Sequence, residues 1–174
     1  MNLEEWAKRL EDLAGPQKEE FLAGCVNELA ARLLTKVRKR TPVGPGEFAV
    51  VGSWDNSKGH IKGEKYARGK KKGQYRLKKL RSGGNLRRGW HIVPASRVGN
   101  RYTATVANNV RYASYVEYGH RQHVGQFVPV LGKRLARPWV PGKHMLRISH
   151  DELKKQAGGI LSRRLHEYLE RARP

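Results

Sequence analysis

The sequence predicts an α+β fold: a small antiparallel β-sheet packed by long N- and C-terminal helices, with a long basic loop insertion. Three observations predict it. Apolar residues recur at helical spacing near both ends of the chain, period-2 alternation follows Gly89, and the segment between has neither period. At 174 residues the chain is expected to form a single domain, residues 1–174, around one core.

Two helical patterns occupy the N-terminal part of the chain. Residues 2–14 have the spacing of a short helix that begins with a capping box, and Gly15-Pro16 separates this helix from the next. In residues 17–40, adjacent i,i+4 rows of apolar side chains predict a helix about 36 Å long. Thr41-Pro42 ends it, because a residue before proline is displaced from the α region.

The chain has one cysteine, Cys25, which lies in an apolar row of the second helix. This position predicts a buried thiol, since free cysteine is among the most buried residue types. A single cysteine excludes an internal disulfide and indicates a chain made inside the cell.

Residues 44–88 form a basic, glycine-rich segment. We expect it to be a flexible insertion, with room for a short hairpin, that orders on a partner. Its second part, from Lys58 to Arg88, holds thirteen Lys or Arg residues and one acid, Glu64. Such a segment repels itself unless it meets a polyanion or projects into water. The predicted polyanion or partner contacts are Lys58, Lys62, Lys65, Arg68, Lys70, Lys71, Lys72, Arg76, Lys78, Lys79, Arg81, Arg87 and Arg88.

Two interpretations of the role of these cations stay open. In one they contact nucleic acid and release counterions, which makes affinity salt-dependent. In the other they are solvated and serve solubility. Tyr66 and Tyr75 lie among the cations and could stack on exposed bases. Two tyrosines are little evidence for base readout, so we favour contact with the phosphate backbone.

Strand signals follow the basic segment. Residues 90–93 and 102–107, with a turn at 98–100 between them, predict an antiparallel hairpin. Tyr112–Tyr118 fits a helical turn or a strand, and the proline in residues 127–130 favours an edge strand there.

The C-terminal helix is predicted from a second capping box and an apolar face. Ser149 with Glu152 three residues later indicates that the helix begins at Ser149. Gly158-Gly159 weakens its middle by about 1 kcal/mol per glycine relative to alanine.

Other site classes have weak support. The Gly69–Gly73 loop lacks the Gly-Lys-Ser/Thr end of a phosphate-binding loop. His120 and His123, with Glu117 nearby, lack the second cluster that a zinc site would need. We therefore predict no metal, cofactor or catalytic residue, and a nuclease acting through Glu117 or His120 is the least supported function. No apolar run is long enough to span a membrane.

Three short motifs occur in order along the chain. The first is split between Thr41-Pro42-Val43 and the run Gly84-Asn85-Leu86-Arg87-Arg88-Gly89-Trp90, the second is Val106–His120, and the third is Trp139–Leu146. Together they resemble the phage tail-component family, the tail-completion or head–tail joining proteins of long-tailed phages. In that family the first motif is contiguous, so the basic segment resembles an insertion into it. The resemblance covers about residues 17–172 apart from this insertion.

The resemblance implies a non-enzymatic virion protein of the phage neck. Such a protein is made in the bacterial host cytoplasm and forms a homo-oligomeric ring between the portal or connector and the tail terminator or tail tube. The basic insertion would then face packaged DNA, through backbone contact, or acidic partner surfaces. The block from Tyr112 to Gly119 suits either a subunit interface or core packing. Its candidate interface residues are Tyr112, Tyr115, Glu117 and Tyr118, and Glu117 could pair with an arginine of the next subunit in a closed ring. The alternative is a non-enzymatic nucleic-acid-binding protein that uses residues 58–88.

Overall fold

The computed structural model describes residues 16–44, 46–55, 60–129 and 131–171, so the predicted helix at 2–14 lies outside the described residues. The chain groups into two compact units. The first, called the body, comprises Met1–Thr41, Leu86–Arg111 and His144–Pro174, and the second unit comprises Pro42–Asn85 and Tyr112–Lys143. A single domain with a flexible insertion at 44–88 stays a prediction.

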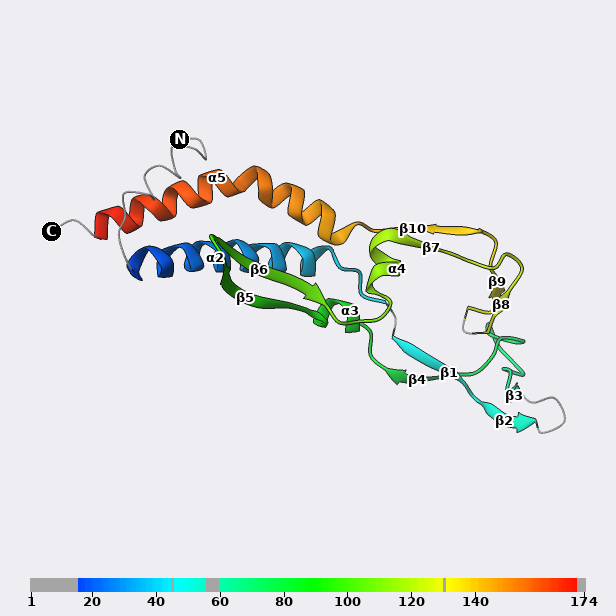
Figure 1. The fold of residues 1–174 in the computed structure, drawn as a ribbon. Coiled ribbons are helices and arrows are strands. Elements are labelled where there is room, and N and C mark those ends of the chain that lie inside the picture. The colour runs from blue at the N-terminus through cyan, green and yellow to red at the C-terminus, as the bar shows by residue number, and fades with distance from the viewer. Residues whose placement is uncertain (1–15, 45, 56–59, 130, 172–174) are drawn as a thin grey trace. The chain divides into compact units, whose positions relative to one another are not determined.

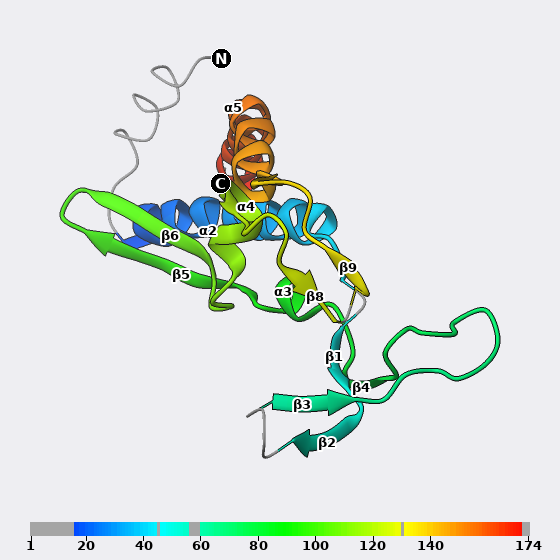
Figure 2. The ribbon, with the colours of Figure 1, turned by 90° about the vertical axis from the view of Figure 1, so that its right-hand side faces the viewer.

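The body consists of two long helices and a β-hairpin, which confirms the predicted α+β class. Helix α2 (Pro16–Arg40) lies between α5 (Met145–Arg171) on one side and the β5–β6 hairpin (Trp90–Val98 and Arg101–Asn108) on the other (Figure 1). In Figure 2 α5 is seen nearly end-on while α2 runs across the view, so the two helices cross. The short helix α3 (Asn85–Arg88) precedes β5.

The predicted apolar rows of α2 form its contact with α5. Phe21 and Cys25 are buried with Leu165 of α5, and the ring of Tyr168 lies 4.6 Å from that of Phe21. The predicted burial of Cys25 is therefore confirmed. At the edge of this core, Arg164 Nε lies 3.2 Å from a carboxylate oxygen of Glu28 on α2.

The hairpin at residues 90–108 is also confirmed, with its turn at Gly99-Asn100. Its ladder is interrupted between Val93 and Ser96. Pro94 lies in this gap and cannot donate a ladder hydrogen bond. The neighbouring amide of Ala95 donates instead to Asn27 Oδ1 of α2, at 2.7 Å. The irregularity thereby ties the hairpin to the helix.

The predicted start of the last helix at Ser149 was wrong. Helix α5 begins at Met145, and Ser149 lies inside its first turns, fully buried, with its hydroxyl donating to the Met145 carbonyl oxygen at 2.7 Å. A serine hydroxyl can bond four residues back within a helix as well as cap one, so the pattern alone misplaces the boundary. Burial of Met145 favours the earlier start. The helix continues through Gly158-Gly159 without a break.

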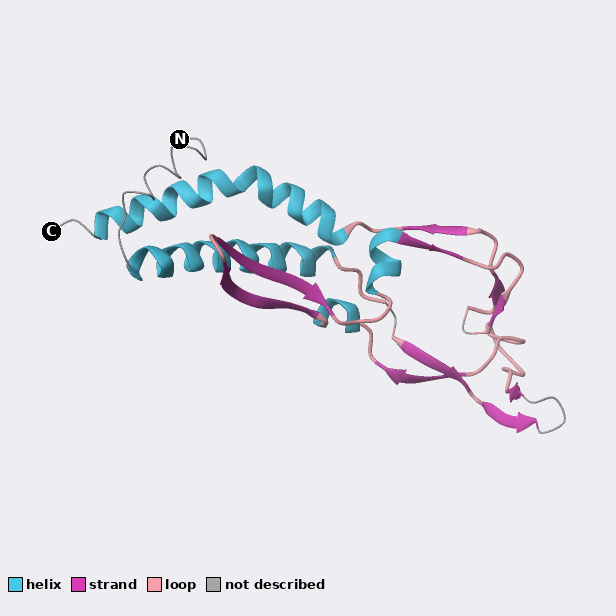
Figure 3. Cartoon of the chain, in the orientation of Figure 1, coloured by secondary structure: helices cyan, strands magenta, loops and turns pink. Residues whose placement is uncertain are grey.

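The second unit is built of short antiparallel strand pairs and one helix, α4 (Ala113–Tyr118), as Figure 3 shows. Tyr112–Tyr118 is thus a helical turn, and β8 is a two-residue strand within the predicted 127–130. The pairs are β1 (Glu47–Val50) with β4 (Leu77–Arg81), β2 (Gly52–Asp55) with β3 (His60–Gly63), β7 (Gly119–Arg121) with β10 (Trp139–Pro141), and β8 (Phe127–Val128) with β9 (Lys133–Arg134).

Among the described helices of both units, none has the length and apolar character needed to cross a bilayer.

Candidate interaction surfaces

The two halves of the first motif meet in the body through buried hydrogen bonds. The indole N–H of Trp90 donates to Thr41 Oγ1 at 2.9 Å, and that hydroxyl donates to the Val37 carbonyl oxygen at 2.7 Å. Thr41 is 0% and Trp90 4% exposed. The residues on either side of the insertion are therefore held together in the body.

Arg87, predicted as a polyanion contact, takes part in the same junction. Its Nε and Nη2 atoms donate to the Thr41 carbonyl oxygen at 3.1 and 2.6 Å. Arg38 donates in turn to the Trp90 carbonyl oxygen at 2.7 Å. Carbonyl groups at a helix C-terminus lack intrahelical donors, and cations there are favoured by the helix dipole. Both arginines thus stabilise the end of α2.

The second and third motifs meet in the second unit by close backbone packing. Gly119 has a φ of 89°, and a Cβ atom at this position would lie 2.5 Å from the Val140 carbonyl oxygen and 2.8 Å from the Trp139 ring. A Cβ at Gly142 would lie 2.2 Å from the Glu117 carbonyl oxygen. These approaches explain why both motifs place glycine there. The indole of Trp139 therefore lies close to Gly119, the residue that follows Tyr118 in the chain.

The second unit has no buried apolar side chain among its described residues. All ten buried apolar side chains of the described chain belong to the body. By contrast, the second unit holds nine of the twelve exposed large apolar side chains that the structure describes. Seven of these nine come from its second segment and are here called the apolar surface: Tyr112, Tyr115, Tyr118, Val124, Phe127, Leu131 and Trp139. A compact unit of this kind has apolar area left for partners to cover.

The four predicted interface residues divide into two groups. Tyr112, Tyr115 and Tyr118 are 44, 60 and 67% exposed, whereas Glu117 is 6% exposed. The tyrosines are therefore available for contact, and Glu117 is enclosed within the single chain. The His120 ring lies 5.9 Å from that of Tyr115, and its buried Nδ1 has no hydrogen-bond partner among the described atoms.

A surface cavity of about 400 Å³ lies beside the apolar surface. It is lined by Arg121, Gln122, His123, Pro138 and Trp139. The described residues contain no cluster of three His, Cys, Asp or Glu side chains that could hold a metal ion.

The basic segment forms a forked arrangement of strand pairs, and residues 60–81 of it are here called the basic arm. Three backbone hydrogen bonds join the branches: Val51 N to Arg76 O, Glu64 N to Val51 O and Arg76 N to Glu64 O, at 2.7–2.9 Å. Beyond the fork, residues 65–75 continue as a second narrow ribbon, with Lys65 bridged to Tyr75 and Tyr66 N donating to Gln74 O. One short hairpin was expected in this segment, and the structure has three antiparallel pairs: β1 with β4, β2 with β3, and the bridge of Lys65 to Tyr75.

Most predicted cations lie exposed on this arm. Arg76 forms an ion pair with Glu64 at 2.9 Å, and both side chains are half exposed. The Lys65 ammonium lies 5.0 Å from the Tyr75 ring centroid, and that of Lys71 lies 5.9 Å from the Tyr66 centroid. The remaining exposed arm cations, for which the described side chains provide no ion pair, are Lys62, Arg68, Lys70, Lys72, Lys78 and Lys79. Lys58 and the Arg81 side chain lie outside the described part of the chain, and Arg88 is exposed beside the junction.

Sequence reasoning missed Thr41 and Trp90 as a hydrogen-bonded pair and Trp139 as part of the apolar surface. A Trp and a Thr that each flank the same insertion were the available signal for the first. For the second, the signal was an aromatic residue two positions before Pro141-Gly142.

The described residues define the class of the fold: an α+β body of two long helices and a hairpin, with a second unit that exposes apolar and cationic side chains. The chain belongs to the HK97-gp10-like family, described as "Bacteriophage HK97-gp10, putative tail-component", whose model matches residues 4–119. This confirms the resemblance that the motifs indicate, and it makes the protein a phage tail component, located in the virion among other virion proteins. No curated protein and no solved structure matches the chain.

Proposed function

We propose that the protein acts in the phage neck as a tail-completion or head–tail joining subunit, assembled as a ring between the connector and the tail. The role is structural and needs no catalytic group. The observation that carries the proposal is the second unit, whose described residues expose large apolar side chains and bury none. Membership of a family of tail components supports it further.

The apolar surface has the composition of a protein interface. Tyrosine, tryptophan and phenylalanine are enriched in such interfaces because each removes a large area from water, and tyrosine and tryptophan also keep a polar group for hydrogen bonding. Tyr115, Tyr118 and Trp139 are all about half exposed or more. The Trp139 indole also lies close to Gly119, the residue that follows Tyr118 in the chain. These side chains would anchor the contact with a neighbouring copy.

The charges around the apolar surface favour a head-to-tail contact over a two-fold one. A two-fold contact through this surface would place five cations of one copy against the same five of the other: Arg121, Lys133, Arg134, Arg137 and Lys143. The body mixes the two signs, because the exposed acids Asp151, Glu167 and Glu170 of α5 each lie beside a histidine or arginine of the same helix. A contact between unlike surfaces propagates from copy to copy and can close into a ring.

A complementation experiment tests the role. Phage lacking the gene would be supplied with the wild-type chain or with a Tyr115→Ser, Tyr118→Ser variant, and attached tails would be counted by electron microscopy. We expect the variant to fold normally and to leave heads and tails separate. The matched control is Val93→Ser, Val98→Ser, which removes two similarly exposed apolar side chains from the β5–β6 hairpin and should restore tail attachment.

A second candidate is a nucleic-acid-binding protein that works outside the virion through residues 58–88, favoured by the concentration of charge there. Normal tail attachment without the gene, together with purified virions that contain no copy of the chain, would contradict the neck role and favour this alternative.

A further inference from the structure

We propose that the basic arm is a contact surface for duplex DNA, which it binds through the phosphate backbone without reading sequence. The surface of the arm differs in kind from the apolar surface of the same unit. Residues 62–79 expose no large apolar side chain, whereas residues 112–139 expose seven. A protein partner would need an apolar centre for its interface, and Leu80, near the end of β4, is the one large apolar side chain that the described residues of the arm expose. A phosphate backbone needs only cations.

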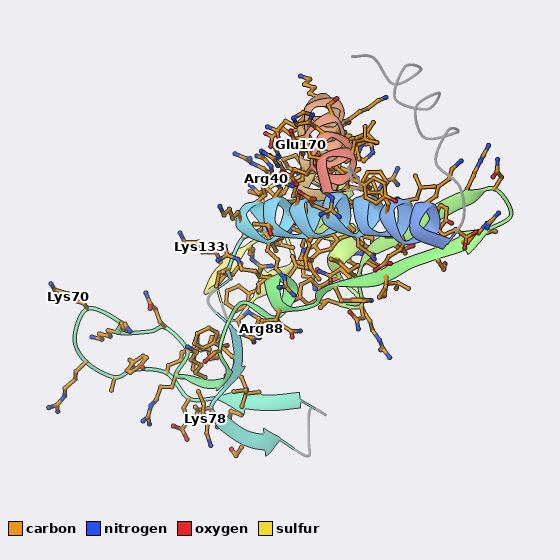
Figure 4. All side chains as sticks on the ribbon, turned by 90° about the vertical axis from the view of Figure 1, so that its left-hand side faces the viewer. Arg40, Lys70, Lys78, Arg88, Lys133 and Glu170 are labelled. Carbon is orange, nitrogen blue, oxygen red and sulfur yellow. The ribbon has the colours of Figure 1, made fainter. Side chains whose placement is uncertain are left out.

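The tip of the arm presents its cations on a fixed turn. Tyr66 accepts from Gly73 N at 2.9 Å, Lys72 N donates to Gly69 O at 3.0 Å, and Gln74 N donates to Lys71 O at 3.0 Å. Gly69 and Gly73 have φ values of 82° and 81°, a conformation that other residues rarely adopt. Figure 4 shows Lys70 at the far end of this loop, pointing away from the ribbon. The turn is held by backbone hydrogen bonds, so the exposed side chains of Arg68, Lys70 and Lys72 are not needed to hold it.

The two-stranded form of the ribbon suits a groove of B-DNA. Lys65 and Tyr75 are bridged and Tyr66 pairs with Gln74, while residues 68–74 form the turn, so the tip is a narrow loop of two paired segments. A two-stranded ribbon fits the major groove, which is about 12 Å wide. Cations on the two sides of the turn, Arg68 and Lys72, would then face phosphates on both walls of the groove.

The tyrosines of the arm argue for a duplex over a single strand. Proteins that bind single strands stack bases on exposed aromatic rings. Here Tyr66 and Tyr75 are half-buried, with the Lys71 and Lys65 ammonium groups over their rings. The Tyr75 ring also lies 6.1 Å from that of Phe127. Both rings contact lysines and Tyr75 also contacts Phe127, so they are not platforms for bases, and the exposed cations of the arm recognise charge alone.

This inference goes beyond the neck role, since it stands on the residues of the arm whether or not the protein forms a ring. Duplex binding by the arm could therefore be disproved while the neck role is upheld, and the neck role could be disproved while duplex binding is upheld.

The experiment measures binding of fluorescent duplexes of two unrelated sequences, and of one of their single strands, to the full chain by anisotropy at increasing salt. The tip variant replaces Arg68, Lys70, Lys71 and Lys72 by glutamine. Affinity falls with salt, and each phosphate contact contributes about −0.9 to the slope of log affinity against log salt. Losing four contacts should therefore make the slope of the tip variant less negative by about 3.6. The loss of affinity between about 50 and about 200 mM salt should then become about 150-fold smaller than for the wild type.

The matched control removes four exposed cations from the body: Arg101, Arg111, Lys154 and Lys155, each replaced by glutamine. It has the same net charge as the tip variant and should keep the wild-type slope. Equal slopes in the two variants would overturn the proposal, because binding would then follow net charge. Tighter binding of the single strand would also overturn it. No duplex binding, with binding to a polyglutamate peptide instead, would favour an acidic protein partner.

A third variant removes the arm and keeps the fold. A Cβ atom at Gly83 would lie 1.8 Å from the Gly44 carbonyl oxygen, so these two positions face each other closely. Residues 45–82 can therefore be replaced by an Asn-Gly turn, which joins facing strands in two residues. This variant should lose duplex binding while its far-UV circular dichroism still reports α2 and α5. Retained duplex binding would place the contact elsewhere and overturn the proposal.

Discussion

Replacing Thr41 by valine tests whether the junction at the base of the insertion depends on its buried hydrogen bonds. Valine has nearly the shape of threonine, so packing changes little and the hydroxyl is the group removed. Two bonds are lost: the one that Thr41 Oγ1 accepts from the Trp90 indole and the one that it donates to the Val37 carbonyl oxygen.

The size of the loss in unfolding free energy depends on which polar groups the substitution leaves without a hydrogen-bond partner. The Val37 carbonyl oxygen still accepts from the Thr41 amide at 2.9 Å, so it keeps a partner. The indole N–H of Trp90 is a donor only, and Trp90 is buried, so its donor would be left without an acceptor. An orphaned buried donor costs about 1–3 kcal/mol and a lost hydrogen bond about 1 kcal/mol. We expect Thr41→Val to lower the free energy of unfolding by about 2–4 kcal/mol.

A double-mutant cycle with Trp90→Phe isolates the pair. In the phenylalanine background there is no indole N–H to leave unpaired, so Thr41→Val should cost about 1–3 kcal/mol less there. Urea unfolding followed by far-UV circular dichroism is the suitable assay, because it reports the helices of the body and does not depend on tryptophan fluorescence. A coupling energy near zero would refute the reasoning, since the two side chains would then contribute independently.

Three further outcomes are expected. Gly119→Ala and Gly125→Ala both place a Cβ at a positive φ (89° and 86°), but only the Cβ at Gly119 would meet neighbouring atoms. Amide hydrogen exchange in β7 and β10 should therefore accelerate far more for Gly119→Ala than for Gly125→Ala. Equal effects of the two substitutions would show that this crowding is unimportant. A hydrogen bond from Arg40 lowers the pKa of Glu152, so this carboxylate stabilises the fold above its ordinary pKa and the contribution is lost as the pH falls through the lowered pKa. Glu152→Gln should therefore flatten the acid side of a stability–pH curve from urea midpoints, and an unchanged curve would contradict it. Burial raises the pKa of the Cys25 thiol, so iodoacetamide should alkylate it slowly until urea unfolds the body, whereas fast native labelling would show an accessible thiol.

The body was largely predictable because its signals are local and periodic. The apolar rows of α2 and the alternation around Gly99 each identify one element, and burial of those side chains agrees with both. Ser149 was misread because a capping pattern and a serine bonded back to Met145 share the same sequence. The bond between Trp90 and Thr41 spans residues far apart in sequence, so no local pattern reveals it.

The basic arm was not predictable in detail. Its pairing at Val51, Glu64 and Arg76 is made by backbone atoms, and lysines and glycines there show no period-2 alternation. Strands that bury little on either face leave no pattern in the sequence. The exposed cations were therefore foreseen as a charged segment, while their arrangement on a turn was not.

The second unit combines exposed apolar side chains with sixteen Lys or Arg residues against four acids. Free subunits that meet through this unit would first experience mutual repulsion, which acts over roughly 8 Å at physiological salt. Premature aggregation through the exposed tyrosines would thus be slowed until an anionic surface neutralises the positive charge of the unit. In the proposed ring, this electrostatic balance would set the order of assembly: the charge is neutralised first, and the apolar surfaces come into contact afterwards.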